Sequence, residues 1–387
     1  MHSMRKISSF IKHAALAAGF DLAGISPVRD FDELAYFPQW IAAGHAGEMK
    51  YLEARDGTGQ LKRESLHVAA PWAHSVIVCA INYNTSQPYS TAASDPECGW
   101  ISRYAWGCED YHDVVLRRLR ELEKRLCEAV APGRSDAPSA TAGEPSATAG
   151  GMPALPLRTW CYVDTGPIVE RVYAKYAGVG WIGKNTCVLN QQLGSWLFLG
   201  VILTSLELLP DLPAPDRCGT CTRCLDACPT NAFPAPYQLD ATRCISYLTI
   251  EKRGPIPEEL RDGMGRHVFG CDICQDVCPW NRKAPVSSSP EFQPREGLVN
   301  PALQWLAEMK AEDFREQFRG SPVRRTKLSG LRRNAAIAMG NSGNREFVPV
   351  LEKLRDEEDA VVSESAGWAL RKLADPSTSK LPGQHKS

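Results

Sequence analysis

The 387-residue sequence lacks several features that would place it in common protein classes. No apolar run approaches the roughly 18 residues that a membrane span needs. The N-terminus has no signal-peptide core, because Lys12 and His13 interrupt its apolar stretch. The formal net charge of −1 excludes a chain that is basic throughout, so any nucleic-acid contact must be local. We therefore expect a cytoplasmic protein without membrane association.

Cysteine is abundant, but it is not spread as in a secreted disulfide framework. Of 14 cysteines, eight lie between Cys218 and Cys278. The run Cys-x2-Cys-x2-Cys-x3-Cys-Pro that ends at Pro229 is the bacterial ferredoxin pattern for two [4Fe–4S] clusters. Its fourth cysteine ligates the other cluster, so the spacing assigns Cys218, Cys221, Cys224 and Cys278 to one cluster and Cys228, Cys244, Cys271 and Cys274 to the second.

The assignment to two clusters has one gap in its pattern and one alternative metal, zinc. The second half of the pattern lacks one cysteine, and Cys244 is the only thiol in the segment that can replace it. Zinc also accepts four cysteine thiolates. The three-then-one spacing with a following proline favours clusters over zinc. Two adjacent clusters conduct electrons, which implies a redox partner and a second redox centre.

The remaining sequence divides by composition and periodicity. Helical and strand patterns alternate up to about residue 210, and the continuous apolar run Ser75–Tyr83 is typical of a sheet covered on both faces. Ala131–Pro153 is rich in Ala, Pro, Gly and Ser, which predicts a flexible insertion. We expect an α/β domain over 1–210, a two-[4Fe–4S] ferredoxin-like domain over 211–290 and a helical domain over 291–387.

The helical domain contains two similar segments. Residues 334–339 and 365–370 match at an offset of 31 positions, and each lies on a predicted helix with another helix between them. This pattern favours a short repeat of the HEAT type, although an ordinary helical hairpin would also explain it.

Several segments outside the cysteine region, taken with that region, resemble one family. They are Ser102–Gly107, Asp110–Asp113, Asp164–Gly166, Gly178–Asn185 and Gly194–Ser195. In this order they resemble epoxyqueuosine reductase, an iron–sulfur enzyme of tRNA modification, from about Arg5 to Leu373. The chain departs from the family pattern at Cys108-Glu109, where two residues stand in place of one. Enzymes of this family bind cobalamin, and Cys108 could be an axial ligand of its cobalt, but the simpler interpretation is that Cys108 is a small apolar residue.

The resemblance implies an activity and its cofactors. The family reduces epoxyqueuosine to queuosine in the tRNA anticodon loop, the last step of queuosine synthesis. It uses base-off cobalamin and two [4Fe–4S] clusters, and an external donor such as a flavodoxin or ferredoxin supplies the electrons. We accordingly expect a monomeric oxidoreductase with a cobalamin-binding α/β domain and a HEAT-like tail that contacts the anticodon stem-loop.

Asp164 is the predicted catalytic residue. It directly follows the strand Arg158–Val163, at the edge where α/β sheets place ligands, and it matches the family's proton donor. An acid that donates near neutral pH needs a raised pKa, so we predict an apolar, cobalamin-covered environment for it. A simple cap for the following helix is the alternative role. Glu170 and Arg171 are interpreted as surface charges outside the site.

The resemblance also implies contacts with cobalamin. Matched position by position, these are Arg63, Ser102, Asp164, Lys184, Asn185, Val188 and Leu199. The Gly-rich sequence that contains Lys184 and Asn185 suits a close approach of the backbone to a corrin, but ordinary turns share its composition.

A local basic segment predicts the tRNA contact. Residues 317–345 contain no acidic side chain. A basic segment in a near-neutral chain is an electrostatic footprint for phosphate, whereas a solvated helix face would carry balancing acids. The predicted tRNA-binding residues are Lys252, Arg324, Arg325, Lys327, Arg332 and Arg333.

Two other functions compete with this one. A cobalamin-dependent reductive dehalogenase would share the cofactors, but such enzymes usually carry an export signal and do not need a basic tail. A non-catalytic electron carrier would need only the cysteine segment and would leave the preceding domain unexplained.

Overall fold

The computed structural model describes residues 2–130 and 157–375, so the predicted insertion Ala131–Pro153 lies outside the described residues. A four-stranded sheet forms the N-terminal half, in the order β1-β2-β7-β4. All three strand pairings are antiparallel. The strands are β1 (Leu22–Pro27), β2 (Ser75–Asn82), β7 (Leu197–Thr204) and β4 (Thr159–Tyr162).

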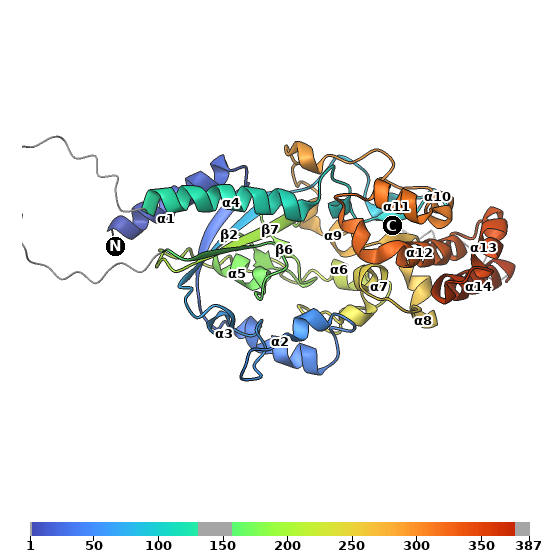
Figure 1. Ribbon diagram of the computed structural model, residues 1–387, viewed down its shortest axis with the longest axis horizontal. Helices are drawn as coiled ribbons and strands as arrows, with labels where there is room; N and C mark the ends of the chain where they lie inside the picture. The colour runs from blue at the N-terminus through green and yellow to red at the C-terminus, as the bar shows by residue number, and fades with distance from the viewer. Residues whose placement is uncertain (1, 131–156, 376–387) are drawn as a thin grey trace, which may run out of the picture.

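Helices cover both faces of this sheet, as the apolar run of β2 predicts. Ile77, Cys79 and Ile81 face a core shared with α1 (His2–Ala17) and α4 (Tyr111–Val130). The alternate residues of the strand face a core shared with α5 (Glu170–Tyr176). Figure 1 shows α1 and α4 on one side of the sheet and α5 on the other.

The α/β prediction is therefore right for the layers but wrong for the strand direction it implies. Alternating strands and helices are typical of parallel sheets, in which all carboxyl ends meet at one edge. Here β4 runs antiparallel to β7, and its last residue, Tyr162, pairs with Val201 in the middle of β7. Asp164 does follow the end of β4, but in an antiparallel sheet the amino and carboxyl ends of neighbouring strands alternate along that edge.

Two short helices and two small ribbons complete this half. The helices α2 (Asp32–Ala42) and α3 (Leu66–Ala69) lie on the α5 side of the sheet (Figure 1). One antiparallel ribbon pairs β5 (Trp181–Ile182) with β6 (Val188–Leu189). A parallel ribbon pairs β3 (Trp100–Ile101) with β8 (His267–Phe269), which joins the N-terminal half to the cysteine segment.

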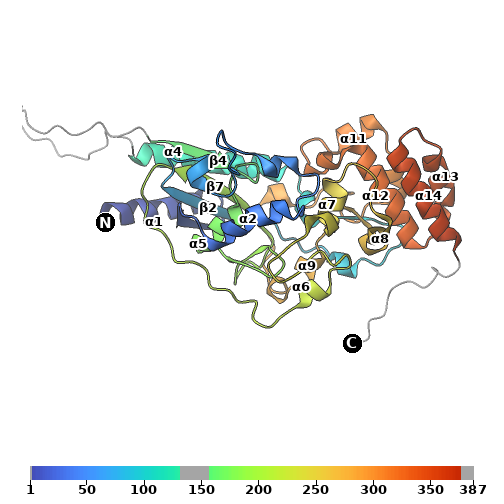
Figure 2. The same ribbon diagram turned by 90° about the horizontal axis from the view of Figure 1, so that it is seen from below.

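The cysteine segment consists of short helices between ligand loops. In Figure 2, α6 and α9 lie at the lower edge of the molecule, whereas α7 and α8 adjoin the C-terminal helices. These four helices are α6 (Arg223–Asp226), α7 (Ile245–Ile250), α8 (Glu258–Arg261) and α9 (Ile273–Asp276).

The C-terminal helices share a hydrophobic core with the cysteine segment rather than forming a separate one. The two similar sequences lie on α12 and α14 with α13 between them, as predicted. Gly340 allows close packing here, because a Cβ atom on it would lie 2.9 Å from Ala369 of α14. These helices are α10 (Leu303–Glu308), α11 (Ala311–Gln317), α12 (Lys327–Ser342), α13 (Val348–Arg355) and α14 (Ala360–Ala374).

No helix in the described part of the chain is both long and apolar enough to cross a bilayer.

Candidate functional site

A cleft of about 1070 Å³ lies where the two halves of the molecule meet. This volume is at the upper end of the roughly 300–1,000 Å³ usual for ligand pockets, so the cleft can hold more than a single nucleoside. Its lining comes from segments that are far apart in sequence. Among the lining residues are Tyr51, Arg63, Tyr104, Asp110, Tyr111, His112, Asp164, Arg171, Ser246, Phe269, Arg324 and Arg325.

Asp164 lies in the cleft at the centre of a network of polar side chains. Tyr111 donates its hydroxyl hydrogen to Oδ2 of Asp164. Nε2 of His112 lies 3.0 Å from Oδ1 of Asp164, and Nδ1 of the same ring lies 2.7 Å from Oδ1 of Asp110. Asp110 and His112 precede or begin α4, whereas Asp164 follows β4, so the fold brings these groups together.

This network reverses the predicted pKa shift of Asp164. Burial alone would raise the pKa of Asp164, but the hydrogen bond and charge of His112, together with the Tyr111 hydroxyl, outweigh burial and lower it. Burial opposes the charge of His112, but its bonds to Asp110 and Asp164 raise the His112 pKa to about 9. At neutral pH the pair is thus an imidazolium and a carboxylate, and the predicted raised pKa of Asp164 is wrong.

Glu170 and Arg171, interpreted from sequence as surface charges, belong to the site. The Asp164 N–H donates to Oε1 of Glu170 at 2.7 Å. Burial, and then the Asp164 charge, raise the pKa of Glu170 to about 8. Arg171 lines the cleft and donates to the Thr186 carbonyl at 2.9 Å. In the sequence, this contact could have been anticipated from the position of Glu170 at the start of the helix that follows Asp164.

The residues predicted to contact cobalamin separate into two groups. Arg63 and Asp164 line the cleft, and Arg63 donates to the Ile168 carbonyl at 3.0 Å. The other five are not among the residues that line the cleft. Lys184 donates to the carbonyls of Gly219 and Cys221, Asn185 donates to the Cys274 carbonyl, and the hydroxyl of buried Ser102 donates to Asp272. Val188 is buried and Leu199 is partly buried.

For two of the clustered thiols, Cys224 and Cys271, the neighbouring thiols belong to the set predicted for them. Burial, and then the charges of Cys278, Cys218 and Cys221, raise the pKa of Cys224 to about 11. Burial, and then Cys244 with Cys228 among its other neighbours, raise the pKa of Cys271. Cys187, which belongs to neither predicted set, also lies in this region, in hydrogen-bonding contact with Cys274.

The described residues contain no group of side chains arranged for a single metal ion. Over residues 2–130 and 157–375, no three Cys, His, Asp or Glu side chains converge closely enough to hold one metal ion. Ser246 and Phe269, each two positions from a predicted ligand of the second set, line the cleft, so the cleft borders segments that carry that set.

Only part of the predicted tRNA-binding set is available at the surface. Arg324, Arg325 and Lys327 are exposed, and the first two line the cleft, but Arg325 is paired with Glu251. Lys252 is paired with Glu48, and mostly buried Arg332 is paired with Glu357.

Arg333 is fully buried, so the prediction that it contacts tRNA is wrong. Its guanidinium donates to the carbonyls of Leu248, Lys252 and Gly254, at and beyond the C-terminal end of α7. Helix ends leave such carbonyls without partners inside the helix, and a buried cation satisfies them. Arg333 therefore has a structural role.

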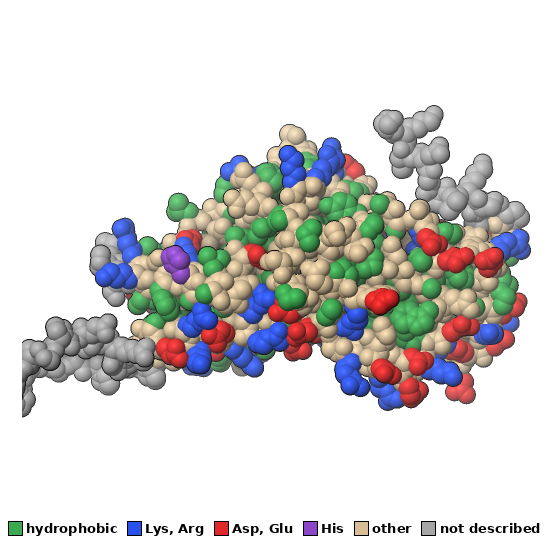
Figure 3. All heavy atoms as spheres, turned by 90° about the horizontal axis from the view of Figure 1, so that it is seen from above, with side chains coloured by type: hydrophobic (Ala, Val, Ile, Leu, Met, Phe, Trp, Pro, Cys, Tyr) green, Lys and Arg blue, Asp and Glu red, His purple; other side chains and the backbone are tan. Residues whose placement is uncertain are grey.

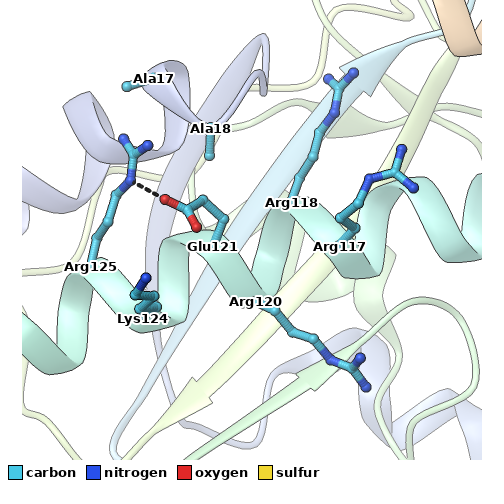
Figure 4. A pocket seen from close by; sticks show the side chains of 8 residues that line it. All are labelled: Ala17, Ala18, Arg117, Arg118, Arg120, Glu121, Lys124 and Arg125. Atoms are coloured by element: carbon cyan, nitrogen blue, oxygen red, sulfur yellow. Dashed lines mark hydrogen bonds and ion pairs between the residues drawn. The ribbon is translucent and has the colours of Figure 1, made fainter.

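A second hollow shows that basic charge alone does not mark the site. It has a volume of about 550 Å³ and lies between the end of α1 and one face of α4 (Figure 4). Most of its lining is Arg and Lys from α4, and Arg125 pairs with Glu121. Figure 3 likewise shows acidic and basic side chains mixed at the end formed by the C-terminal helices.

Comparison with known proteins places the chain in a family. Residues 63–139 match the model described as epoxyqueuosine reductase QueG, DUF1730, and residues 217–281 match a 4Fe-4S double cluster binding domain. The epoxyqueuosine reductase of Pseudomonas aeruginosa is 39% identical over 95% of this chain and 94% of its own length. That of Escherichia coli is 34% identical, over 95% of this chain and 89% of its own.

Solved structures agree with these relatives. A crystal structure of epoxyqueuosine reductase with an epoxyqueuosine-modified tRNA-Tyr stem loop is 30% identical, with a TM-score of 0.81 over 97% of this chain and 92% of that one. The Bacillus subtilis enzyme, 29% identical with a TM-score of 0.79 over 97% and 92%, was solved with the catalytic loop of an aspartate swung out of the active site. The chain described here belongs to the epoxyqueuosine reductase family of oxidoreductases.

Proposed function

We propose that this protein reduces epoxyqueuosine to queuosine in the anticodon loop of tRNA, the last step of queuosine synthesis, with cobalamin and two [4Fe–4S] clusters. The observation that carries the proposal is the composition of the cleft. The cleft contains the Asp164–His112 pair and the exposed Arg324. It also borders segments that carry the second predicted thiol set. The tRNA stem loop bound by a related enzyme supports the same substrate.

The reaction sets the requirements for the site. Converting the epoxide to an alkene removes its oxygen as water and consumes two electrons and two protons. In our proposal Asp164, and through it His112, delivers a proton to the oxygen that leaves. His112 carries that proton at neutral pH, because its pKa is about 9. A carboxylate that accepts hydrogen bonds from Tyr111 and His112 is oriented before the substrate arrives.

The cofactors would occupy the two sides of this cleft. Cobalamin, when bound, supplies electrons at low potential to the substrate carbon. Arg63 and the polar wall of the cleft would contact its amide side chains. The two thiol sets would hold the clusters, and an external flavodoxin or ferredoxin would reduce them.

The substrate would enter from the side of the C-terminal helices. Arg324 and Lys327 would contact phosphates of the anticodon stem, and Arg325, whose guanidinium carbon lies 5.3 Å from the centre of the Tyr51 ring, would lie at the mouth of the cleft. A modified base in a loop can be splayed into such a cleft without opening a duplex.

A single-turnover experiment tests the proposal. Protein with reconstituted clusters is mixed with tRNA that bears epoxyqueuosine, with and without cobalamin, and a strong chemical reductant. We expect loss of one oxygen atom from the nucleoside, detected by mass spectrometry, only when cobalamin is present. Failure to convert the substrate, with cobalamin bound and clusters intact by spectroscopy, would refute the assignment.

A further inference from the structure

Asp164 occupies a strained turn. Its φ angle is +49°, in the left-handed region that non-glycine residues rarely adopt. The Thr165 N–H donates to the Val163 carbonyl at 2.7 Å, so a three-residue turn closes around Asp164. Such a turn persists only where surrounding contacts impose it. The direction of the Asp164 carboxyl group therefore depends on the contacts that stabilise the backbone of this turn.

Glu170 supplies that contact from a fixed position. The Asp164 N–H donates to Oε1 of Glu170 at 2.7 Å, across a loop of five residues. Glu170 is the first residue of α5, whose next turns are buried against the sheet. Between the two, Arg63 donates to the Ile168 carbonyl at 3.0 Å. The turn is thus tied to a helix that cannot move without disturbing the core.

We propose that Glu170 is a positioning residue, whose side-chain oxygen holds the Asp164 turn so that its carboxyl group faces His112 and the cleft. This inference rests on the proposed function for its catalytic consequence, but not for its structural one. The competing role for Glu170 is purely local, because an acid in the first turn of a helix stabilises the helix through its dipole.

Three variants separate these roles. Glu170→Gln keeps an oxygen acceptor at the same reach but cannot ionise. Glu170→Asp keeps an ionisable carboxyl group at the helix start but is one methylene shorter and falls short of the Asp164 N–H. Glu170→Ala removes both. Because the raised pKa of about 8 leaves the Glu170 carboxyl group mainly neutral at pH 7, glutamine is a close mimic there. Glu123→Gln, beside the other end of β4, is the matched control.

The primary measurement is hydrogen exchange of the peptide that contains residues 163–169, followed by mass spectrometry on the protein with its clusters. It does not require turnover, so a failure of the proposed function leaves it interpretable. We expect faster exchange for Glu170→Ala and Glu170→Asp, and exchange close to that of the parent protein for Glu170→Gln and Glu123→Gln. The single-turnover rate should fall about 10- to 100-fold in the first two variants with tRNA affinity unchanged.

The opposite order would overturn the inference. If Glu170→Asp behaves like the parent protein while Glu170→Gln exchanges faster and melts at lower temperature, the residue acts through charge at the helix end. Unchanged exchange in Glu170→Ala would likewise show that other contacts hold the turn.

Discussion

The cleft and the hollow on α4 are both lined by charged side chains, but they are assembled differently. Six residues of the hollow come from adjacent turns of one helix, and the other two are alanines. The cleft takes its lining from segments near residues 51, 110, 164, 250 and 325, which meet only in the folded protein. A single helix is therefore enough to form a charged surface. An oriented acid–histidine pair beside a set of thiols requires contacts between segments that are distant in the sequence.

The largest expected effect concerns the second predicted set of thiols. Cys244→Ala removes one of four proposed ligands, so we expect loss of one cluster, a fall from about eight to about four iron atoms per chain, and no turnover. Cys187→Ala is the matched control, because Cys187 lies in hydrogen-bonding contact with the ligand Cys274 but is not in either set. Iron analysis and electron paramagnetic resonance of both variants provide the measurement. Iron loss in Cys187→Ala instead of Cys244→Ala would mean that the ligand sets are wrong.

Asp164→Asn should give the next largest effect. The amide keeps the shape, but its single oxygen cannot accept from both Tyr111 and His112, and it cannot pass the His112 proton to the substrate, so the single-turnover rate should fall about 10²- to 10⁴-fold. Cobalamin and tRNA binding, measured by absorbance and filter retention, should stay close to those of the parent protein. Glu121→Gln in the hollow should change none of these values. A rate for Asp164→Asn within about threefold of the parent would assign the proton to another group.

His112→Asn tests where the proton of the pair resides. Because the His112 pKa is about 9, the imidazolium is present below that pH and lost above it. The rate of the parent protein should therefore fall as pH rises through about 9, and the variant should lack this limb and be roughly 10- to 100-fold slower at pH 7.

The same shift affects stability in a defined direction. A histidine whose folded pKa lies above its ordinary value of 6.5 stabilises the fold fully below pH 6.5, and loses this contribution as pH rises through about 9. Thermal unfolding across this range should show the loss in the parent protein and not in His112→Asn. A parent rate that stays constant through pH 9 would contradict the proton assignment.

Much of the fold follows from periodicity in the sequence. The predicted strand Ser75–Tyr83 matches β2, and Arg158–Val163 contains β4. The charged, amphipathic pattern of residues Tyr111–Val130 likewise predicts a helix, and α4 spans those residues. These elements were predictable because each buries a face that repeats every two or 3.6 residues. Strand direction was not, since alternation of strands and helices does not record which neighbour a strand pairs with.

The site was predicted where chemistry follows spacing and missed where it follows tertiary contacts. The thiol sets follow from the ferredoxin spacing, and Asp164 follows from its motif. The lowered pKa of Asp164 depends on His112, which reaches it from another element. Arg333 belongs to a basic segment, but its environment is set by carbonyls some 80 positions away in the sequence. Charge in a sequence does not reveal whether a neighbouring helix end needs a donor.

The smallest expected effect returns to the two basic regions. Arg324 and Lys327 are exposed near the cleft, Arg120 and Lys124 are exposed on α4, and none of the four forms an ion pair within the described residues. Reversing Arg324 and Lys327 to Glu should weaken tRNA binding about tenfold near 0.1 M salt and reduce its salt dependence by about one unit per lost phosphate contact. Reversing Arg120 and Lys124 changes the net charge equally, so the two variants differ only in the position of the change. Equal weakening by both would show that tRNA responds to the overall charge of the protein and not to a surface at the cleft.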